Sequence, residues 1–293
     1  MILEKPQRCA IKVLITGGSG YIGRATANYL DSEVTLVDLH NDFNDPRLHI
    51  TDLTNYRKLE KVFEIEKPNV VLHLAGYKSV SESKVYPTKY YYNNLVSSLN
   101  LINICEKLNT PMVFASTAAI YYGETPYSKS KLIIEEALAN SKINHIILRY
   151  FNVGGLLEPA TSRQLGNVFD VIRLNASVGK LFMAHKGSAS RDYTHIYDLA
   201  CINAQALKMV CKGITLKTYD VLSGNAYTLD DLLRLYEQEG NPINFKYVGS
   251  TQEPQINLKL KPFPYKHSLG IEDIVKSEIK YGMTSPTFLG PTC

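Results

Sequence analysis

The feature that most constrains the fold is a glycine-rich stretch directly after a short apolar run, "IKVLITGGSGYIGRATANYL" at residues 11–30. The run is typical of a buried strand, and the pattern from about Tyr21 predicts a helix. Gly17, Gly20 and Gly23 would give a tight turn, close approach of backbone N–H groups to a pyrophosphate, and close packing of helix on strand. The positive end of the helix dipole would then face the phosphates. The spacing predicts a dinucleotide-binding loop, and an ordinary flexible turn is the alternative.

The same alternation continues through the first half of the chain. Short runs rich in Val, Ile and Leu alternate with stretches whose apolar residues recur every three and four positions, such as "TNYRKLEKVFEIEK" and "NNLVSSLNLINICEKLN". This pattern predicts parallel strands buried on both faces and joined by right-handed helical crossovers. We therefore expect an α/β fold, a Rossmann-like doubly wound parallel sheet.

The rhythm changes after "RYFNVGG". One helix is expected in "QLGNVFDVIRLNASVG" and one short strand in "KLFMA", followed by further mixed elements. We expect a Rossmann domain over residues 1–155 and a smaller mixed α/β substrate-binding lobe over 156–293, with segments at about 191–224 returning to the Rossmann sheet. The tail "MTSPTFLGPTC" lacks periodicity and is expected to be poorly ordered.

Bulk composition narrows the class of protein. The chain has 293 residues, of which 45% are hydrophobic, so a sizeable core is possible. The net charge of +4 comes from scattered basic residues, which gives nucleic-acid binding no support. Five widely spaced cysteines favour reduced thiols over a disulfide framework or zinc cluster, and no metal site is expected. With no signal-peptide pattern and no run of about 18 apolar residues, we expect a cytoplasmic protein without a membrane segment.

An acidic residue follows the second predicted strand. Asp38 in "LVDLHNDF" comes about twenty residues beyond the glycine loop, where a carboxylate can accept hydrogen bonds from the adenosine ribose diol. No arginine adjoins it in this stretch, so a 2′-phosphate would meet repulsion without a counter-charge. The sequence therefore predicts NAD rather than NADP.

The chain resembles the extended short-chain dehydrogenase/reductase family, and within it the UDP-glucose (UDP-galactose) 4-epimerases most closely. The resemblance covers roughly residues 11–210 and rests on motifs that occur in the family's order: "TGGSGYIG", "HLAGYKSVSES", "YYYNNL", "FASTAAIYYG", "YSKSK", "LRYFN" and "RDYTHIYDLA". It implies a UDP-sugar substrate, an NAD cofactor, and a homodimer formed as a four-helix bundle by the helices at about 86–108 and 127–140.

The resemblance also implies a set of cofactor contacts. Tyr21 and Ile22 would offer backbone N–H groups to the pyrophosphate, and Asp52 and Leu53 would flank the adenine. The other implied members of the cofactor shell are Ala75, Gly76, Lys78, Asn93, Tyr127, Lys131 and Tyr150. Two of these have alternatives, Lys78 as a solvated surface lysine and Asn93 as a helix cap.

Thr117, Tyr127 and Lys131 match the family's catalytic threonine or serine, tyrosine and lysine. A free tyrosine titrates at about pH 10, so a tyrosine base at neutral pH needs a lowered pKa. A lysine ammonium one helical turn away and a positively charged nicotinamide would both favour the phenolate. Tyr127 would take the proton of the sugar 4-OH while hydride passes from C4 to NAD, and hydride would return to the opposite face of the 4-ketose.

Two alanines limit the chemistry. Related 4,6-dehydratases carry an Asp-Glu pair just after the catalytic threonine, whereas this chain has Ala118 and Ala119. Since alanine cannot transfer protons, elimination is disfavoured and oxidation and reduction at C4 remain.

On the substrate side, the resemblance implies that Asn152 and Asn167 contact the diphosphate of the nucleotide sugar and that the segment around Phe182 meets uracil. Arg191 and Tyr193 also match family positions, and the Arg191 guanidinium could bind the diphosphate in a bidentate fork. We interpret His195 as a satisfied histidine near a strand end and Asp198 as a helix N-cap.

Three departures from the family pattern concern the substrate. Only "ETP" separates Gly123 from Tyr127, where the family usually has some twenty residues that help to cover the sugar, so the site is either more open or closed by another element. The family's diphosphate arginine is missing from "YVGSTQEPQINLKL". Lys259 or Lys261 could substitute by charge, but lysine lacks the planar fork. The lobe after residue 156 is also shorter than usual.

These observations leave three hypotheses. The first is an NAD-dependent epimerase that inverts C4 of a UDP-hexose or UDP-N-acetylhexosamine. The second is an NAD(P)-dependent reductase or dehydrogenase of the same family, acting on a keto sugar or another alcohol. The third is a non-catalytic NAD-binding regulator, suggested by the trimmed lobe and the missing arginine.

Overall fold

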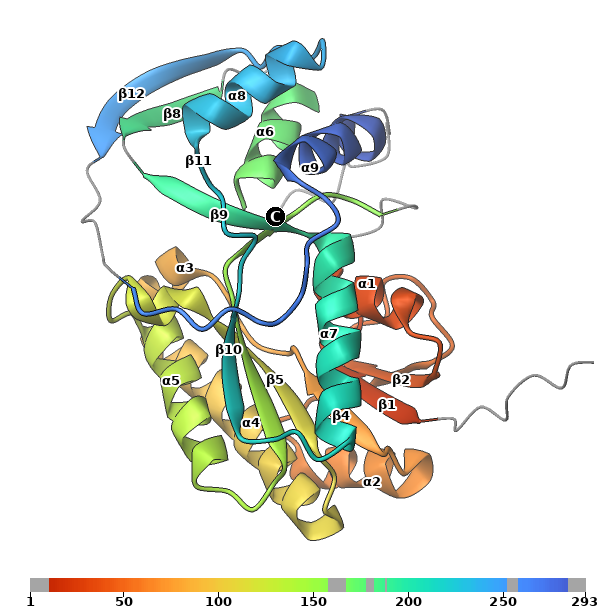
Figure 1. The fold of residues 1–293 in the computed structure, drawn as a ribbon. Helices are drawn as coiled ribbons and strands as arrows, with labels where there is room; N and C mark the ends of the chain where they lie inside the picture. Colours follow the sequence, from red (N-terminus) through yellow and green to blue (C-terminus); the bar gives the residue numbers. More distant parts are fainter. Residues whose placement is uncertain (1–10, 158–166, 178–181, 188, 252–257, 284–293) are drawn as a thin grey trace, which may run out of the picture.

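A seven-stranded, fully parallel sheet forms the centre of the computed structural model, which describes residues 11–157, 167–177, 182–187, 189–251 and 258–283 (Figure 1). Its strands are β1 (Lys12–Thr16), β2 (Glu33–Asp38), β3 (Leu48–Ile50), β4 (Val70–His73), β5 (Met112–Thr117), β6 (His145–Tyr150) and β10 (Lys217–Val221). They lie in the order β10-β6-β5-β4-β1-β2-β3. The order reverses between β1 and β4, so the predicted Rossmann-like doubly wound sheet is confirmed.

Helices cover both faces of this sheet. One face packs against α1 (Tyr21–Tyr29) and α7 (Ile196–Cys211), the other against α2 (Tyr56–Glu66), α4 (Pro87–Leu108) and α5 (Pro126–Ala139) (Figure 1). Strand β5 shows why its sequence is apolar throughout: Val113 and Ala115 join the first cluster, and Met112 and Phe114 join the second. Each fully buried large apolar side chain contributes roughly 1.5–3 kcal/mol, which favours burial on both faces.

The small lobe contains the remaining sheets. A three-stranded sheet joins β7 (Asn152–Gly154), β9 (Ser190–His195) and β11 (Ala226–Thr228), and a parallel pair joins β8 (Phe182–Gly187) and β12 (Phe245–Thr251). Its helices are α6 (Val168–Ser177), α8 (Leu229–Gln238), α9 (Ile271–Glu278) and the short π-helix η2 (Ile279–Met283). Phe169, Tyr193 and Tyr236 are among the side chains of its own apolar core.

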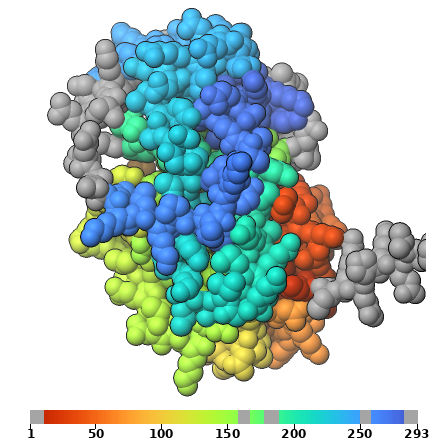
Figure 2. All heavy atoms as spheres, viewed as in Figure 1, coloured from red at the N-terminus to blue at the C-terminus, as the bar shows by residue number. Residues whose placement is uncertain are grey.

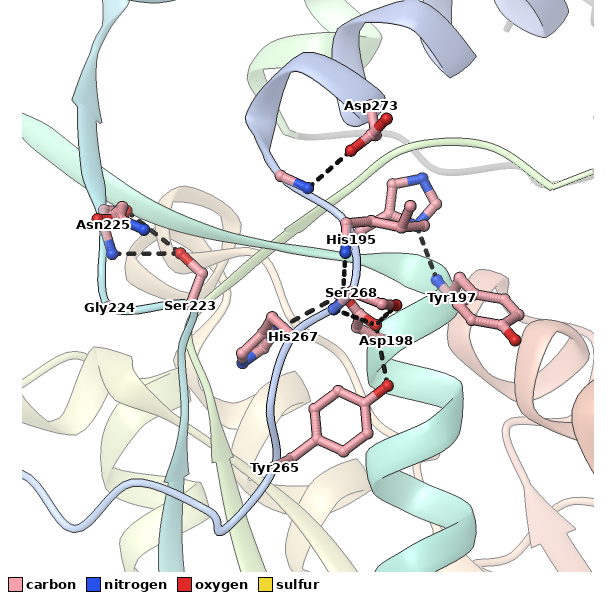
Figure 3. Close-up of polar contacts among 12 residues, drawn as sticks. His195, Tyr197, Asp198, Ser223, Gly224, Asn225, Tyr265, His267, Ser268 and Asp273 are labelled. Carbon is pink, nitrogen blue, oxygen red and sulfur yellow. Dashed lines mark hydrogen bonds and ion pairs between the residues drawn. The ribbon is translucent and has the colours of Figure 1, made fainter.

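A segment that we call the strap, residues 258–270, runs from beyond β12 to α9 across the surface of both lobes (Figures 1 and 2). Pro262 bridges to Asp220 of β10, and Phe263 is buried in the core beneath α7. The Asp198 carboxylate anchors the strap further on, because it accepts hydrogen bonds from the Tyr265 hydroxyl (2.9 Å), the Ser268 hydroxyl (2.6 Å) and backbone N–H groups (Figure 3).

The prediction that Asp198 caps α7 is wrong. Strand β9 continues to His195, and the helix begins at the next residue, so His195 is the N-cap and Asp198 lies in the first turn. The His195 Nδ1 accepts a hydrogen bond from the Tyr197 backbone N–H at 3.0 Å (Figure 3). The interpretation of His195 as a satisfied, buried histidine at a strand end is confirmed.

The elements expected in the second half are found at α6 and β8. The expected division of the chain at about residue 155 stays a prediction, and so does the disorder of the tail, because residues 284–293 lie outside the described part. In the ranges that the structure describes, no helix has the length and apolarity that crossing a bilayer requires.

Candidate functional site

A cleft of about 1480 Å³ opens where the carboxyl ends of β1, β4, β5 and β6 meet the small lobe. This is where open α/β sheets bind ligands, at the point where the strand order reverses. The structure brings most of the predicted site residues to this one cleft; those that line it are Gly17, Gly20, Tyr21, Ile22, Gly23, Asp38, Asp52, Leu53, Ala75, Gly76, Lys78, Asn93, Thr117, Tyr127, Lys131, Tyr150, Asn152, Asn167 and Arg191.

The glycine loop has the shape that its sequence predicts. Gly17 has a φ of +71°, and a Cβ there would lie 2.9 Å from the backbone N of Ala75. A Cβ on Gly23 would lie 2.2 Å from the Gly17 carbonyl oxygen, so a side chain would separate the helix from the loop. The first helical residue is Tyr21, with Gly20 as N-cap and no side-chain cap. The helix N-terminus is therefore left for an anion to approach.

Asp38 ends β2 with its carboxylate held by the backbone. Oδ2 accepts from the Ser19 N–H at 3.0 Å, and Oδ1 accepts from the Leu39 N–H at 2.7 Å. Burial raises the pKa of this carboxyl, and these backbone hydrogen bonds oppose the rise. A fixed, partly buried acceptor at the edge of the cleft fits a ribose diol.

Asn94, which the sequence analysis did not single out, shapes the loop after β4. Its Oδ1 accepts from the Tyr77 N–H at 2.8 Å, and its Nδ2 donates to the Tyr77 carbonyl and to the Ser130 hydroxyl. Gly76 has a φ of +147°, with Asn94 close to where a Cβ would be. The repeated asparagine in "YYYNNL" was the only sequence signal for this role.

The two residues with alternative interpretations can now be placed. Asn93 lies inside α4, which runs from Pro87 to Leu108, so the helix-cap interpretation is wrong. Lys78 lines the open cleft and is exposed there. Desolvation by the surrounding protein lowers the pKa of its ammonium group, and the negative charge of Asp170 opposes this lowering. Lys78 is thus a cation facing the cleft rather than bulk solvent alone.

Thr117 and Tyr127 meet at the end of β5. Thr117 is the last residue of this strand, and Tyr127 is the second residue of α5, whose start is fixed by a capping box at Thr125. Burial raises the pKa of the Tyr127 phenol above 10.0, and a hydrogen bond with Thr117 opposes the rise. The expected lowering of this pKa is therefore not produced by the protein groups around Tyr127.

Lys131 lies one turn further along α5 and is buried. Its Nζ donates to the Ala115 carbonyl oxygen at 2.8 Å and lies 4.7 Å from the centre of the Phe114 ring. Burial lowers the pKa of Lys131 to about 8, and the negative charge of Glu135 opposes the lowering.

The small lobe contributes Asn152, Asn167 and Arg191 to the lining of the cleft. Asn152 donates to the Asp192 carbonyl oxygen at 3.1 Å, and Asn167 donates to the Val153 carbonyl oxygen at 3.1 Å. The guanidinium carbon of Arg191 lies 6.0 Å from the centre of the Tyr122 ring. Both asparagines thus also hold the backbone of the lobe.

One predicted substrate residue is placed elsewhere. Tyr193 does not line the cleft: its ring packs edge-on against Phe169 at 5.3 Å in the core of the small lobe. Strand β9 lies between β7 and β11, and this side chain contacts α6 through Phe169. The backbone of Phe182 begins β8 and pairs with Phe245, and the contact of this segment with uracil stays a prediction.

The departures from the family pattern also have a structural outcome. With the loop before Tyr127 shortened, Tyr122, Gly123 and Thr125 line the cleft directly. Lys259 and Lys261 do not line it, and the Lys261 ammonium lies 5.3 Å from the Tyr219 ring. Across the described ranges, the basic side chains that line the cleft are Lys78, Lys84, Lys131 and Arg191.

Comparison with known proteins agrees with this geometry. The sequence profile of the NAD dependent epimerase/dehydratase family matches residues 13–221. The UDP-glucose 4-epimerase of Haemophilus influenzae is 31% identical over 80% of this chain and 85% of its own. Two solved structures share the fold. The UDP-glucose 4-epimerase of Bifidobacterium longum in complex with NAD⁺ and UDP is 25% identical, with a TM-score of 0.77, over 94% of this chain and 99% of that chain. The UDP-glucose 4-epimerase of Brucella ovis in complex with NAD is 20% identical, with a TM-score of 0.83, over 93% of this chain and 99% of that chain.

The predicted resemblance is thereby confirmed along most of the chain. The matched segment includes the glycine loop, Asp38 and the residues at the end of β5, all of which line the cleft. This protein belongs to the NAD-dependent epimerase/dehydratase family.

Proposed function

We propose that this protein is an NAD-dependent epimerase that inverts C4 of a UDP-hexose or a UDP-N-acetylhexosamine through a transient 4-keto intermediate. The observation that carries the proposal is the convergence of Thr117, Tyr127 and Lys131 on a cleft whose floor is a dinucleotide-binding loop. The relatives named above, all UDP-glucose 4-epimerases, support the same activity.

The cofactor side fits NAD. The glycine loop can be this tight because a Cβ at Gly17 or Gly23 would collide with backbone atoms. Asp38 offers a carboxylate, held by backbone hydrogen bonds, to the adenosine ribose. The charge of Asp42 raises the pKa of Asp38, and this second carboxylate would likewise repel a 2′-phosphate. When bound, NAD supplies reversible acceptance of hydride from C4.

The protein manages the proton and the orientation of the sugar. Tyr127 takes the proton of the 4-OH during oxidation and returns it during reduction, with Thr117 bonding the reacting oxygen. Since burial raises the pKa of Tyr127, the positive charges of Lys131 and an oxidised nicotinamide are needed to favour its phenolate. Ala118 and Ala119 line the cleft beside Thr117 and supply no further acid or base, which excludes a dehydratase-like role for them.

Arg191 is the proposed diphosphate clamp, and Asn152 and Asn167 line the same cleft. It lines the cleft from β9 and carries the planar fork that suits a diphosphate. Lys84 of α3 (Val80–Val85) adds a further cation to the lining of the cleft.

The test is to mix purified protein and NAD with UDP-glucose, UDP-galactose and their N-acetyl forms. We expect C4 epimers to interconvert without net accumulation of reduced cofactor. Absence of conversion of all four sugars would contradict the proposal. Stoichiometric formation or loss of reduced nicotinamide with a keto sugar or another alcohol would instead identify a reductase or dehydrogenase.

The assembly and location form part of the same proposal. Helices α4 and α5 pack side by side, and each exposes apolar side chains, including Tyr92, Leu99, Leu132 and Ile133. Such a pair of helices suits a homodimer built as a four-helix bundle. The free thiols of Cys105, Cys201 and Cys211 favour a reducing, cytoplasmic location.

A further inference from the structure

A buried polar network begins one turn beyond Lys131 on α5. The Glu135 carboxylate accepts from the Ser116 hydroxyl at 2.5 Å and from the Arg149 Nη2 at 2.6 Å. Arg149 also donates through Nη1 to the Tyr121 hydroxyl at 2.6 Å, which donates in turn to Asp220 at 2.8 Å. Glu135 keeps only 7% of its side chain exposed and Arg149 22%. Charges held this deep interact strongly with one another.

This network adjoins the catalytic end of β5. Ser116 is the residue before Thr117, and Lys131 is bonded to Ala115, the residue before Ser116. The Glu135 carboxylate is thus held against the same strand end as the Lys131 ammonium, one helical turn away on α5. The Lys131 ammonium itself has a neutral carbonyl and an aromatic ring as neighbours.

We propose that Glu135 is a positioning residue for Lys131: its carboxylate keeps the buried lysine in the ammonium form, and Arg149, bound to the same carboxylate, limits how much of that negative charge Lys131 receives. The inference rests on the proposed function, because the ammonium favours the Tyr127 phenolate needed for proton transfer. Its chemical basis is that an unpaired buried ammonium is costly, whereas a nearby carboxylate stabilises it.

Other ionisable groups near Lys131 do not take this role. His73 of β4 is neutral, since burial and the charge of Lys131 lower its pKa to about 3. The other tyrosines on the surrounding elements remain neutral phenols at physiological pH because burial raises their pKa, as at Tyr90, Tyr121 and Tyr150. The Glu82 carboxylate of α3 accepts hydrogen bonds from the Lys89 ammonium and the Tyr90 hydroxyl instead. Glu135 and Arg149 are thus the charged pair next to Lys131.

Two substitutions that break the same ion pair test this charge balance. Glu135→Gln removes the negative charge and leaves Arg149 beside Lys131, so the basic limb of the pH–rate profile should move about one unit to lower pH. Arg149→Gln leaves the whole carboxylate to Lys131, so the limb should move to higher pH. If the ion pair were merely structural, both variants would be less stable, but their basic limbs would not move in opposite directions.

Glu136→Gln is the matched control, because Glu136 is the exposed neighbour on the same helix, and its profile should equal that of the wild type. Arg149→Lys keeps the charge and should also leave the limb in place. If Glu135→Gln does not fold, the two Arg149 variants still test the proposal, because the limb should move in Arg149→Gln and stay in place in Arg149→Lys. An unchanged limb in Glu135→Gln or Arg149→Gln, or a shift of both in the same direction, overturns the proposal.

A second readout separates this inference from the proposed function. In protein carrying isotope-labelled lysine, the Lys131 Nζ resonance is identified by its loss in Lys131→Arg and titrated directly by NMR. A pKa that falls in Glu135→Gln and rises in Arg149→Gln supports the role of Glu135 even if no sugar is epimerised. If the protein is an active epimerase but the pKa of Lys131 is the same in both variants as in the wild type, the inference about Glu135 is wrong and the proposed function still holds.

Discussion

In the proposed mechanism, proton transfer depends on the single hydroxyl group of Tyr127. Its ring is buried and lies 6.4 Å from the Tyr90 ring in an edge-on contact, so Tyr127→Phe keeps the packing and removes only the phenol oxygen. We expect epimerisation to fall by about 10²–10⁴-fold, the usual contribution of a positioned acid or base. Steady-state rates measure the loss, and an unchanged melting temperature shows that the fold is kept. Activity within a factor of two of the wild type would remove Tyr127 from the mechanism.

Gly23 makes a steric prediction at the same scale. Because a Cβ would lie 2.2 Å from the Gly17 carbonyl oxygen, Gly23→Ala must move the helix away from the loop. Such overpacking costs about 1–3 kcal/mol, and we expect it to appear as weaker NAD binding in titration calorimetry. Gly270→Ala is the control, since the nearest atom to its Cβ is the end of the flexible Glu272 side chain. Equal NAD affinity in both variants would contradict the steric role of Gly23.

At the scale of elements, the strap depends on Asp198. This carboxylate is fully buried and accepts hydrogen bonds from the strap at Tyr265, Ser268 and Leu269. Although burial opposes it, the His267 ring 3.7 Å away and hydrogen bonds from Ser268 and Leu269 hold the pKa of Asp198 far below 3.8. Asp198→Asn should lower the free energy of unfolding by about 1–3 kcal/mol near neutral pH.

The pH dependence of this effect follows from the lowered pKa. A carboxyl whose folded pKa is depressed stabilises the protein fully above its unfolded value of about 3.9 and loses that contribution as pH falls below it. The difference in the free energy of unfolding between the wild type and Asp198→Asn should therefore be constant between about pH 5 and pH 7. It should become smaller below about pH 4. Denaturant unfolding at several pH values measures it. A gap that widens on acidification would contradict this account.

At the scale of the whole molecule, the paired helices α4 and α5 predict assembly. Leu99 is 47% exposed and Leu132 is 41% exposed, so neither side chain is needed for the core of one subunit. We expect Leu99→Arg and Leu132→Arg to convert a dimer into a monomer in light scattering, because each places a charge in an apolar interface. Ile214→Arg, between α7 and β10, is the exposed apolar control and should leave the dimer intact. A dimer retained in both test variants would place the interface elsewhere.

The large sheet was predictable because its signals are local. The run from Met112 to Thr117 is apolar enough to be read as a strand buried on both faces, and the glycine spacing specifies a turn and a helix start. Asn94 shows the opposite case. It holds the loop after β4 through contacts seventeen residues away, and nothing in the local sequence distinguishes it from its neighbour Asn93.

By itself, the sequence determined the α/β fold, the dinucleotide loop and the spacing of Thr117, Tyr127 and Lys131, because each depends on residues close together in the chain. Only the tertiary structure decided the electrostatics and the lobe contacts. Asp198 meets Ser268 across seventy residues, and Tyr193 enters a core instead of the cleft. Burial raises the pKa of Tyr127, and the Glu135–Arg149 pair sets the charge beside Lys131. Burial and long-range pairing arise only when distant segments pack, and no local pattern encodes them.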